Sequence, residues 1–459
     1  MKKTILAVIS TILLLTFVLS GRTAPIPQSQ DYPSYLIDNL NIIDVETGAI
    51  RKNQSLLITD GKIERILSQS EVLNYQDRPR KDAMNSYVMP GLIDMHVHGY
   101  VKNAFELTLS HGITHTRILN GIPEHLEWRE EQRQGKWLAS SLSVSSPITH
   151  STWDTPLSWK ADTADEAREI ARQAKRQGYD LIKAYGSMNA ESLSALLDEA
   201  QALGIPVAKH GPHPPEGMTW NKLSQLQSME HVEDIYQGIL DYKRDLEGLP
   251  SAVEKVKELN VPITPTLNIY WQLTRITEDK MQFLNSLPEG YISPVIEYEE
   301  MQNQVKRWLD SSEKMAIHNR KTFSFLQQIT QALEESDIPL LVGSDAGVLL
   351  SPYGLATLNE MALMNQAGLS NLSVLQAATM NAANALALTD EIGFIKEGLN
   401  ADLLILKESP LSDLKALHQP LAVVKDGNWL SEDDLLSLRK NAVESKSLRD
   451  ELLTIIFNY

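Results

Sequence analysis

Two histidines, His96 and His98, stand on either side of a valine in the segment GLIDMHVHG. In an extended strand alternate side chains share a face, so these two imidazoles project to the same side as Asp94. Two imidazoles on one face at a strand end can bind a single metal ion. They can equally be polar residues that terminate a strand, so the motif by itself leaves both interpretations open.

Further ionisable residues stand close to the ends of other short apolar segments. They are Lys183 in YDLIKAYG, His210 in IPVAKHG, His231 in QSMEHVED and Asp345 in LLVGSDAG. An isolated lysine usually lies at the surface, but the position of Lys183 inside an apolar strand predicts a buried site. His210 and His231 could also be core histidines, and Asp345 could cap the helix that follows it.

The elements that must position these residues alternate between helices and short strands. The helical segment TADEAREIARQAKRQGYD contains Gly178 near its end and leads into LIKAYG, and LQQITQALEESD leads into IPLLVGSDAG. This repeat predicts an α/β fold with a parallel sheet, most economically closed as a (β/α)8 TIM barrel; a doubly wound open sheet is the alternative. In a barrel the active site lies at the carboxyl ends of the strands, where the ionisable residues would converge.

Both ends of the chain carry a different, β-rich pattern. Residues 25–88 and 396–430 alternate apolar and polar positions, and Asp-Gly turns at 60–61 and 426–427 predict hairpins. We interpret the two segments as halves of one small composite β-sandwich domain that flanks a central barrel at 89–395.

Two helical segments lie outside this scheme. Residues 271–336 are charged and helical by pattern, and they are longer than an ordinary connection. They could form a lid or an interface. Residues 431–459 also predict helix, as a C-terminal tail without a functional interpretation.

The N-terminus predicts export. Lys2 and Lys3 precede an apolar stretch to about Leu19, and small residues follow, so residues 1–24 resemble a signal peptide of a secreted or periplasmic protein. An uncleaved membrane anchor is the alternative. After cleavage no stable membrane partner is expected.

Composition restricts the partners and the metal ligands. The 459 residues carry a formal net charge of −17, which disfavours nucleic acid as a partner. The sequence contains no cysteine, so disulfides and zinc–thiolate sites are excluded and any metal must be bound by nitrogen and oxygen. A small molecule or a short peptide is the expected substrate, and a homo-oligomer stays open.

Taken together, the motifs resemble the metal-dependent amidohydrolase superfamily. VMPGLIDMHVHG is similar to its first barrel strand, HGITHTRILNG to its second, and IGFIKEGLNADLLILKESPL to the segment that returns to the β domain. GYDLIKAY resembles the binuclear subgroup with a carboxylated lysine, which includes prolidase-like and imidazolonepropionase-like enzymes.

The resemblance implies a set of metal ligands. His96, His98 and Asp345 would hold one divalent ion. His210 and His231 would hold the second, and N-carboxylated Lys183 would span both. Zinc is the expected metal.

The chemistry of such a centre is amide hydrolysis. Carboxylation converts an ammonium into an anionic oxygen donor, and nearby cations lower the pKa of the lysine so that it can react. A hydroxide that bridges two ions is a nucleophile at neutral pH. Asp345 would act as the general base and then the general acid. We expect a dipeptide or an N-acyl amino acid as substrate.

Other residues are candidates for substrate contacts. Tyr185 shares a strand face with Lys183, and His150 and His213 lie in predicted loops near the site. Arg117 could meet a substrate carboxylate, although its direction is open.

Two alternatives remain. A mononuclear deaminase of the same superfamily usually carries a glutamate three residues after the fifth-strand histidine, where this chain has His213, and it has no need of Lys183. A catalytically inactive secreted binding protein could keep the fold alone. Such a protein would be expected to lose ligands, and all the expected ones are present.

Overall fold

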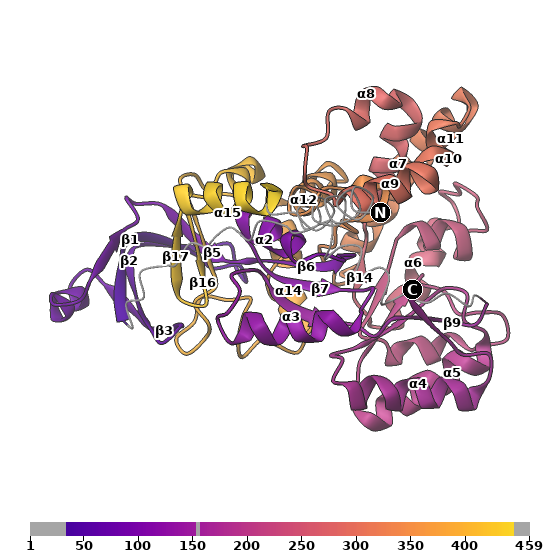
Figure 1. The fold of residues 1–459 in the computed structure, drawn as a ribbon, viewed down its shortest axis with the longest axis horizontal. Coiled ribbons are helices and arrows are strands. Elements are labelled where there is room, and N and C mark those ends of the chain that lie inside the picture. The colour runs from indigo at the N-terminus through magenta and orange to yellow at the C-terminus, as the bar shows by residue number, and fades with distance from the viewer. Residues whose placement is uncertain (1–33, 153–156, 445–459) are drawn as a thin grey trace, which may run out of the picture.

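The computed structural model describes residues 34–152 and 157–444 of the chain. The predicted signal peptide at 1–24 lies outside these residues, as do residues 25–33 of the composite domain and residues 445–459 of the tail. Figure 1 shows an elongated arrangement, with a β-sheet at one end and α/β units with a group of helices at the other.

One sheet contains strands from both ends of the described chain. Its members are β1 (Ser34–Ile43), β2 (Ile50–Thr59), β3 (Lys62–Ser68), β4 (Arg80–Asp82), β5 (Tyr87–Pro90), β15 (Leu403–Leu406), β16 (Ala422–Lys425) and β17 (Asn428–Ser431). The strand order is β17-β16-β15-β5-β1-β2-β3, with β4 beside β1. The antiparallel pair of β15 and β5 joins the two chain ends. The two-layer sandwich stays a prediction.

The Asp-Gly turns lie where the sequence predicted hairpins. Asp60 and Gly61 connect β2 to β3 with φ of 48° and 79°. Asp426 and Gly427 connect β16 to β17 with φ of 50° and 76°. Positive φ at both central residues is typical of the type I′ turn, which Asp-Gly favours. Both hairpin predictions are confirmed.

The remaining strands are parallel. One sheet contains β6 (Leu92–Val97), β7 (Ile113–Ile118) and β8 (Ser141–Val144); the other contains β9 (Ile148–His150), β10 (Ser158–Lys160), β11 (Ile182–Ala184), β12 (Val207–His210), β13 (Ser228–Glu230) and β14 (Ile263–Thr264). Isolated parallel bridges Ser145–Leu181, Ile263–Leu340 and Val97–Ala346 connect these sheets to each other and to the segment 340–346. The α/β class is thus confirmed, and the closed barrel stays a prediction.

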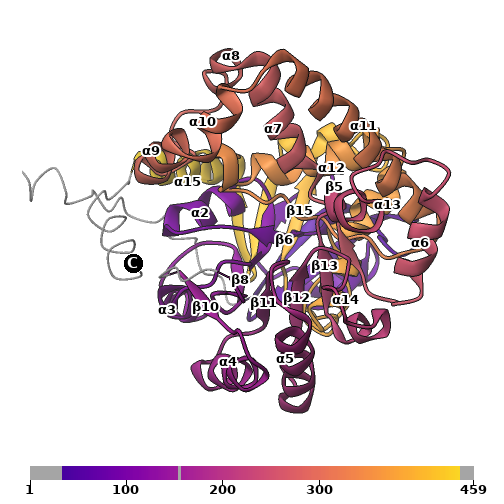
Figure 2. The same ribbon diagram turned by 90° about the vertical axis from the view of Figure 1, so that its right-hand side faces the viewer.

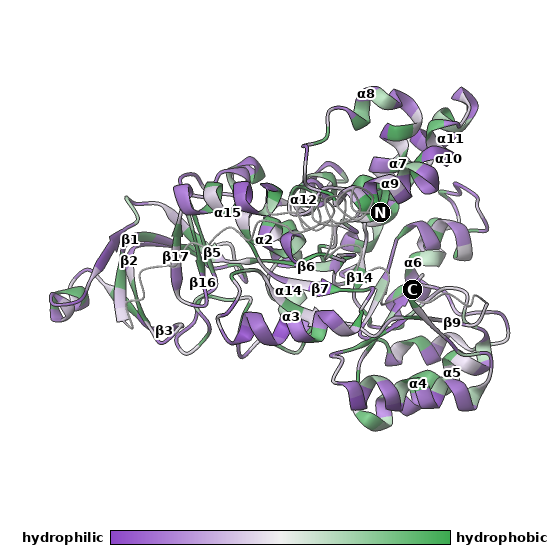
Figure 3. Cartoon of the chain, viewed as in Figure 1, coloured by the Kyte–Doolittle hydropathy of each residue, from purple (hydrophilic) through white to green (hydrophobic). Residues whose placement is uncertain are grey.

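Helices follow most of the parallel strands. They are α2 (Lys102–Ser110), α3 (Pro123–Arg133), α4 (Ala164–Gln177), α5 (Ala190–Leu203) and α6 (Leu249–Lys257). Helix α4 begins with a capping box of Thr163 and Glu166 and ends at Gly178, whose φ of 84° closes the helix. Figure 3 shows hydrophilic and hydrophobic residues together on α4 and α5, and their apolar faces pack inward.

A helical segment separates β14 from residue 340. It contains α7 (Leu267–Asp279), α8 (Met281–Leu284), α9 (Pro294–Gln302), α10 (Gln304–Leu309) and α11 (Glu313–Glu335). Helix α7 packs against α11, and Figure 2 shows this group on the side opposite α4 and α5. Helices at 271–336 agree with the sequence pattern, and their role as a lid stays a prediction.

The last helices return the chain to the sheet. They are α12 (Leu355–Gln366), α13 (Asn371–Ala377), α14 (Met380–Ala385) and α15 (Glu432–Glu444), and α15 packs on α2. Short 3₁₀ segments span Glu71–Tyr75, Trp220–Gln225, Val348–Leu350 and Leu414–His418, and a π turn spans Ile235–Ile239. Among the residues that the structure describes, no helix is both long enough and apolar enough to cross a bilayer.

Candidate metal centre

The two histidines of β6 meet Asp345 at the carboxyl end of the strand. His96 Nε2 lies 3.2 Å from His98 Nε2 and 3.4 Å from Asp345 Oδ1. His98 Nε2 lies 3.1 Å from the same Asp345 oxygen. A backbone hydrogen bond supports this geometry, because Asp345 N donates to His96 O from the segment beside β6. Three potential ligand atoms therefore lie within 3.4 Å of one another.

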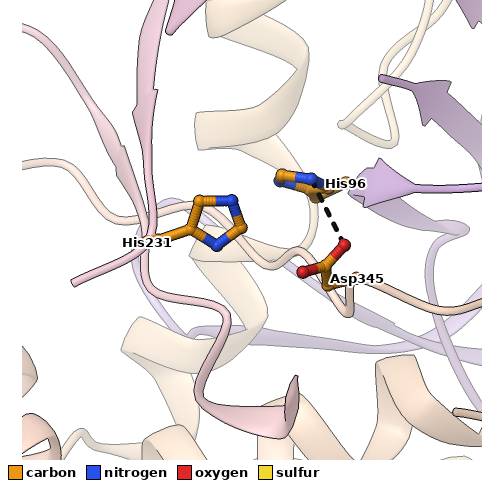
Figure 4. Close-up of side chains that lie close together, drawn as sticks. All are labelled: His96, His231 and Asp345. Atoms are coloured by element: carbon orange, nitrogen blue, oxygen red, sulfur yellow. Dashed lines mark ion pairs between the residues drawn. The ribbon is translucent and has the colours of Figure 1, made fainter. Parts of the chain in front are cut away.

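His231 joins this group from the end of β13. Its ring and the side chains of His96 and Asp345 offer ligand atoms within 4.8 Å of one another, and all three residues are buried (Figure 4). The rings continue outward from there. His231 lies 4.3 Å from His210, and His210 lies 4.4 Å from Tyr185, as measured between ring centroids. The side chains predicted from separate strand ends thus form one continuous cluster.

Lys183 lies in β11 with its ammonium group inside the protein. The residue is 1% exposed, and its Nζ has no hydrogen-bond partner among the described residues. Burial lowers its pKa to about 8, although the carboxylates of Glu230 and Asp345 raise it. A buried amine without an acceptor is unfavourable as a purely structural feature.

Three residues of this centre have strained backbone conformations. Asp345 has a φ of 54°, His231 a φ of 70° and Thr266, which follows β14, a φ of 52°. Such values are uncommon for residues other than glycine, and a β-branched threonine there is an outlier. Strained residues persist where the surrounding structure fixes them, and they cluster at functional sites.

Burial keeps the imidazoles neutral. It lowers the pKa of His96 to about 4 and that of His231 to about 3, and it holds the pKa of His210 well below its usual value. Burial alone would raise the pKa of Asp345, but the neighbouring imidazoles, above all His96, lower it below its usual range. At neutral pH the centre therefore offers imidazole lone pairs and a carboxylate, the states that bind divalent metals.

The donor set fits a metal ion. Bonds of 2.0–2.1 Å in a tetrahedral arrangement put neighbouring donor atoms about 3.3 Å apart. The spacings among His96 Nε2, His98 Nε2 and Asp345 Oδ1 are 3.2, 3.4 and 3.1 Å. Nitrogen and oxygen donors of this kind suit zinc and similar divalent ions.

Sequence reasoning missed the residues behind the histidines. Glu230 Oε2 lies 3.0 Å from His96 Nδ1, Thr266 Oγ1 lies 2.7 Å from His231 Nδ1, and Asp234 Oδ2 lies 3.4 Å from His210 Nε2. The carboxylate next to the strand-end histidine, Glu230 in QSMEHVED, was the signal that could have found the first of these contacts.

Arg117 is placed differently from the sequence hypothesis of a substrate contact. Its guanidinium is fully buried and donates to Glu230 Oε1 at 2.7 Å and to Ser228 Oγ at 2.7 Å. Burial raises the pKa of Glu230, but Arg117, His96 and Lys183 together outweigh burial and hold that pKa well below its usual range. Arg117 therefore belongs to the interior of the protein.

The candidate substrate residues lie in different surroundings. Tyr185 contacts His210 and so borders the centre. His213 packs near Gly211 and Gly238, and its buried Nδ1 has no hydrogen-bond partner within the described part of the chain. His150 is fully buried and bonds Ser158 on the neighbouring strand at 2.8 Å.

Comparisons with known proteins agree with this fold. A curated 5-methylthioadenosine/S-adenosylhomocysteine deaminase from Carboxydothermus hydrogenoformans is 24% identical over 396 residues, which cover 81% of this chain and 84% of the deaminase. A solved bottromycin amidohydrolase has a TM-score of 0.73 at 22% identity and covers 90% of this chain and 91% of its own. A solved Xaa-Pro dipeptidase with bound methionine has a TM-score of 0.66 at 20% identity and covers 87% of this chain and 100% of its own.

The family itself is established by the match to a family model. The model of the amidohydrolase family matches residues 87–430, which include every residue of the centre described above. The chain belongs to the amidohydrolase family and is a metal-dependent hydrolase that acts on carbon–nitrogen bonds.

Proposed function

We propose that the protein hydrolyses the amide bond of a dipeptide or an N-acyl amino acid at a centre of two divalent ions, with zinc preferred. The observation that carries this proposal is the convergence of His96, His98 and Asp345, whose donor atoms lie 3.1, 3.2 and 3.4 Å apart. The likeness to a Xaa-Pro dipeptidase supports a short peptide as substrate.

The buried amine of Lys183 is the argument for a second ion. Its neutral amine would add carbon dioxide and release a proton, which gives an anionic carbamate with two oxygen donors. This change would remove an ammonium that has no acceptor among the described residues. We propose that carboxylated Lys183 spans both ions and that His210 and His231 complete the second site.

The residues of the chain then have separate roles. When bound, the ions polarise the scissile carbonyl and make water a nucleophile at neutral pH. We propose that Asp345, which is buried and whose pKa is held below its usual range, takes a proton from the attacking water and passes it to the leaving amine. Tyr185, beside His210, is the best placed of the proposed substrate contacts; His150 and His213 stay proposals of the same kind.

A mononuclear deaminase is the second candidate. His96, His231 and Asp345 form a compact group that suits a single ion, and a curated relative is a deaminase by name. This function would leave the buried amine of Lys183 without a purpose.

Three further features belong to the same proposal. We propose that the parallel strands close into a (β/α)8 barrel, which the isolated bridges at Leu181, Leu340 and Ala346 support. We propose secretion or a periplasmic location from the pattern of residues 1–24. The substrate is proposed to be small, and nucleic acid is not expected as a partner.

A substrate panel separates the two functions. The purified protein, supplied with Zn²⁺, is incubated with X-Pro dipeptides, N-acyl amino acids and adenosine derivatives, and the released amino acids and ammonia are measured. Free amino acid without ammonia, absent in Asp345→Asn, is the expected result. Ammonia from an adenosine derivative would establish the deaminase and overturn the amide hydrolase.

A further inference from the structure

The side chain of Arg117 is held by acceptors from β6 and from residues 227–230, which include β13. Its Nε donates to Met95 O at 2.6 Å, and its Nη1 donates to Ser228 Oγ at 2.7 Å and to Gln227 Oε1 at 3.2 Å. Its Nη2 donates to Glu230 Oε1 at 2.7 Å. The guanidinium is 0% exposed, so its orientation is fixed by the protein alone.

Glu230 divides its two oxygens between two partners. Oε1 accepts from Arg117 and from the hydroxyl of Ser228, while Oε2 lies 3.0 Å from His96 Nδ1. A carboxylate paired with arginine only accepts hydrogen bonds. The hydrogen bond between Glu230 and His96 therefore requires the proton on Nδ1 of the imidazole.

The other ring nitrogen of His96 then carries a free lone pair. His96 Nε2 is the atom that lies 3.2 Å from His98 Nε2 and 3.4 Å from Asp345 Oδ1, at the proposed metal position. A neutral imidazole has one donor nitrogen and one acceptor nitrogen, so fixing the first also fixes the second. The series of hydrogen bonds that begins at Arg117 thus reaches the metal position through two fixed contacts, Arg117 to Glu230 and Glu230 to His96.

We propose that Arg117 and Glu230 are positioning residues that hold His96 in its Nδ1–H tautomer, so that Nε2 is always presented to the metal. This inference rests on the proposed metal centre. The competing explanation is that the buried pair only ties β7 to β13. Replacing a buried ion pair with apolar residues of similar size is often neutral for stability, so stability and metal affinity can be separated.

Glu230→Gln tests the proposal directly because Arg117 determines the orientation of the glutamine side-chain amide. The guanidinium and the Ser228 hydroxyl both need an acceptor at the position of Oε1. The amide oxygen must therefore face Arg117, and the NH₂ group faces His96 Nδ1. Nδ1 then has to accept, which moves the ring proton to Nε2 and into the metal position.

The experiment measures tautomer and metal affinity separately. Nitrogen-15 NMR of histidine-labelled, metal-free protein gives the tautomer of His96, with its signals assigned by their loss in His96→Gln. Competition with a chromophoric chelator gives the dissociation constant for Zn²⁺. Glu360→Gln is the matched control, because Glu360 is also fully buried but bonds Asn268 N rather than His96.

We expect Nδ1–H in the wild type, Nε2–H in Glu230→Gln, and Zn²⁺ binding weakened by roughly 10- to 100-fold in that variant. The double variant Arg117→Met with Glu230→Leu should lose affinity similarly while its thermal unfolding stays close to that of the wild type. Glu360→Gln should bind Zn²⁺ as the wild type does.

Two results would overturn the inference. One is an Nε2–H tautomer of His96 in the wild type, a measurement that does not depend on the folding of any variant. The other is unchanged Zn²⁺ affinity in both Glu230 variants. A wild type that binds no Zn²⁺ at all would instead refute the proposed metal centre, and the tautomer would still be readable. The two failures are therefore distinguishable.

Discussion

Thr266 fixes the ring of His231. The threonine hydroxyl donates to Pro265 O at 2.7 Å, so it must accept from His231 Nδ1, which also lies 2.7 Å away. The Nδ1 proton is thereby placed, and Nε2 of His231 is the nitrogen left for a metal ion. Because Thr266 holds a φ of 52°, the backbone is strained where this contact is made.

Thr266→Val should weaken metal binding without a large change in fold. Valine keeps the β-branched shape but leaves the His231 Nδ1 proton without its acceptor, so we expect Zn²⁺ affinity to fall by roughly tenfold or more. Thr264→Val is the matched control, because the buried Thr264 hydroxyl has no hydrogen-bond partner in the described structure. Equal affinity for both variants in a chelator competition would contradict this role.

Gly347→Ala should disturb the metal centre more than the same substitution at an ordinary left-handed glycine would. Gly347 has a φ of +96°, and a Cβ there would lie 2.0 Å from His98 O. Gly178 has a φ of +84° with nothing near its Cβ position, so Gly178→Ala measures the backbone strain alone, about 1–2 kcal/mol.

Urea unfolding and metal content of the two alanine variants test this prediction. Gly347→Ala should lose more stability than Gly178→Ala and should also lose bound metal, since the clash displaces the backbone beside His98. Similar midpoints and full metal content in both would show that the close approach at Gly347 does not matter.

Glu360 should make the metal-free protein less stable as the pH rises. Burial raises its pKa from 4.5 to about 8, although backbone N–H groups of Leu267 and Asn268 lower it. Between those values the unfolded chain releases a proton that the folded chain keeps. Unfolding therefore becomes easier by roughly 1.4 kcal/mol for each pH unit.

Glu360→Gln should remove this slope. Urea unfolding of both metal-free proteins from about pH 5 to about pH 8 should show the glutamine variant gaining stability relative to the wild type as the pH rises. Parallel stability curves for the two proteins would mean that Glu360 ionises normally in the folded state.

Tyr185→Phe should separate substrate binding from metal binding. The ring of Tyr185 packs on His210 at 4.4 Å, and phenylalanine keeps that packing. Loss of one hydroxyl contact to the substrate should lower kcat/KM by about fivefold to tenfold while the metal content stays constant. A variant with unchanged kcat/KM would remove Tyr185 from the substrate site.

The sequence predicted the parts of the fold that depend on local pattern. The hairpin turns at Asp60 and Asp426 follow from residue types that tolerate positive φ, and the α/β class follows from repeated helix–strand periods. The strand-end histidines could also be predicted, because parallel strands bring their carboxyl ends to one edge of the sheet.

The supporting residues could not be found in this way. Alternation along a strand places neighbours on opposite faces, yet Glu230 and His231 both reach His96, since the φ of 70° at His231 ends the alternation. The direction of Arg117 and the contact of Thr266 depend on packing between distant strands, which no local pattern encodes.

The most direct test of the central proposal is the number of metal ions bound by each chain. Elemental analysis is applied to the wild type, to Lys183→Met and to Lys209→Met, an equally buried lysine whose Nζ bonds the backbone oxygens of His210 and Gly211. The account predicts about two ions in the wild type and in Lys209→Met, falling to one or none in Lys183→Met. One ion in all three proteins would contradict the binuclear centre and favour the mononuclear deaminase.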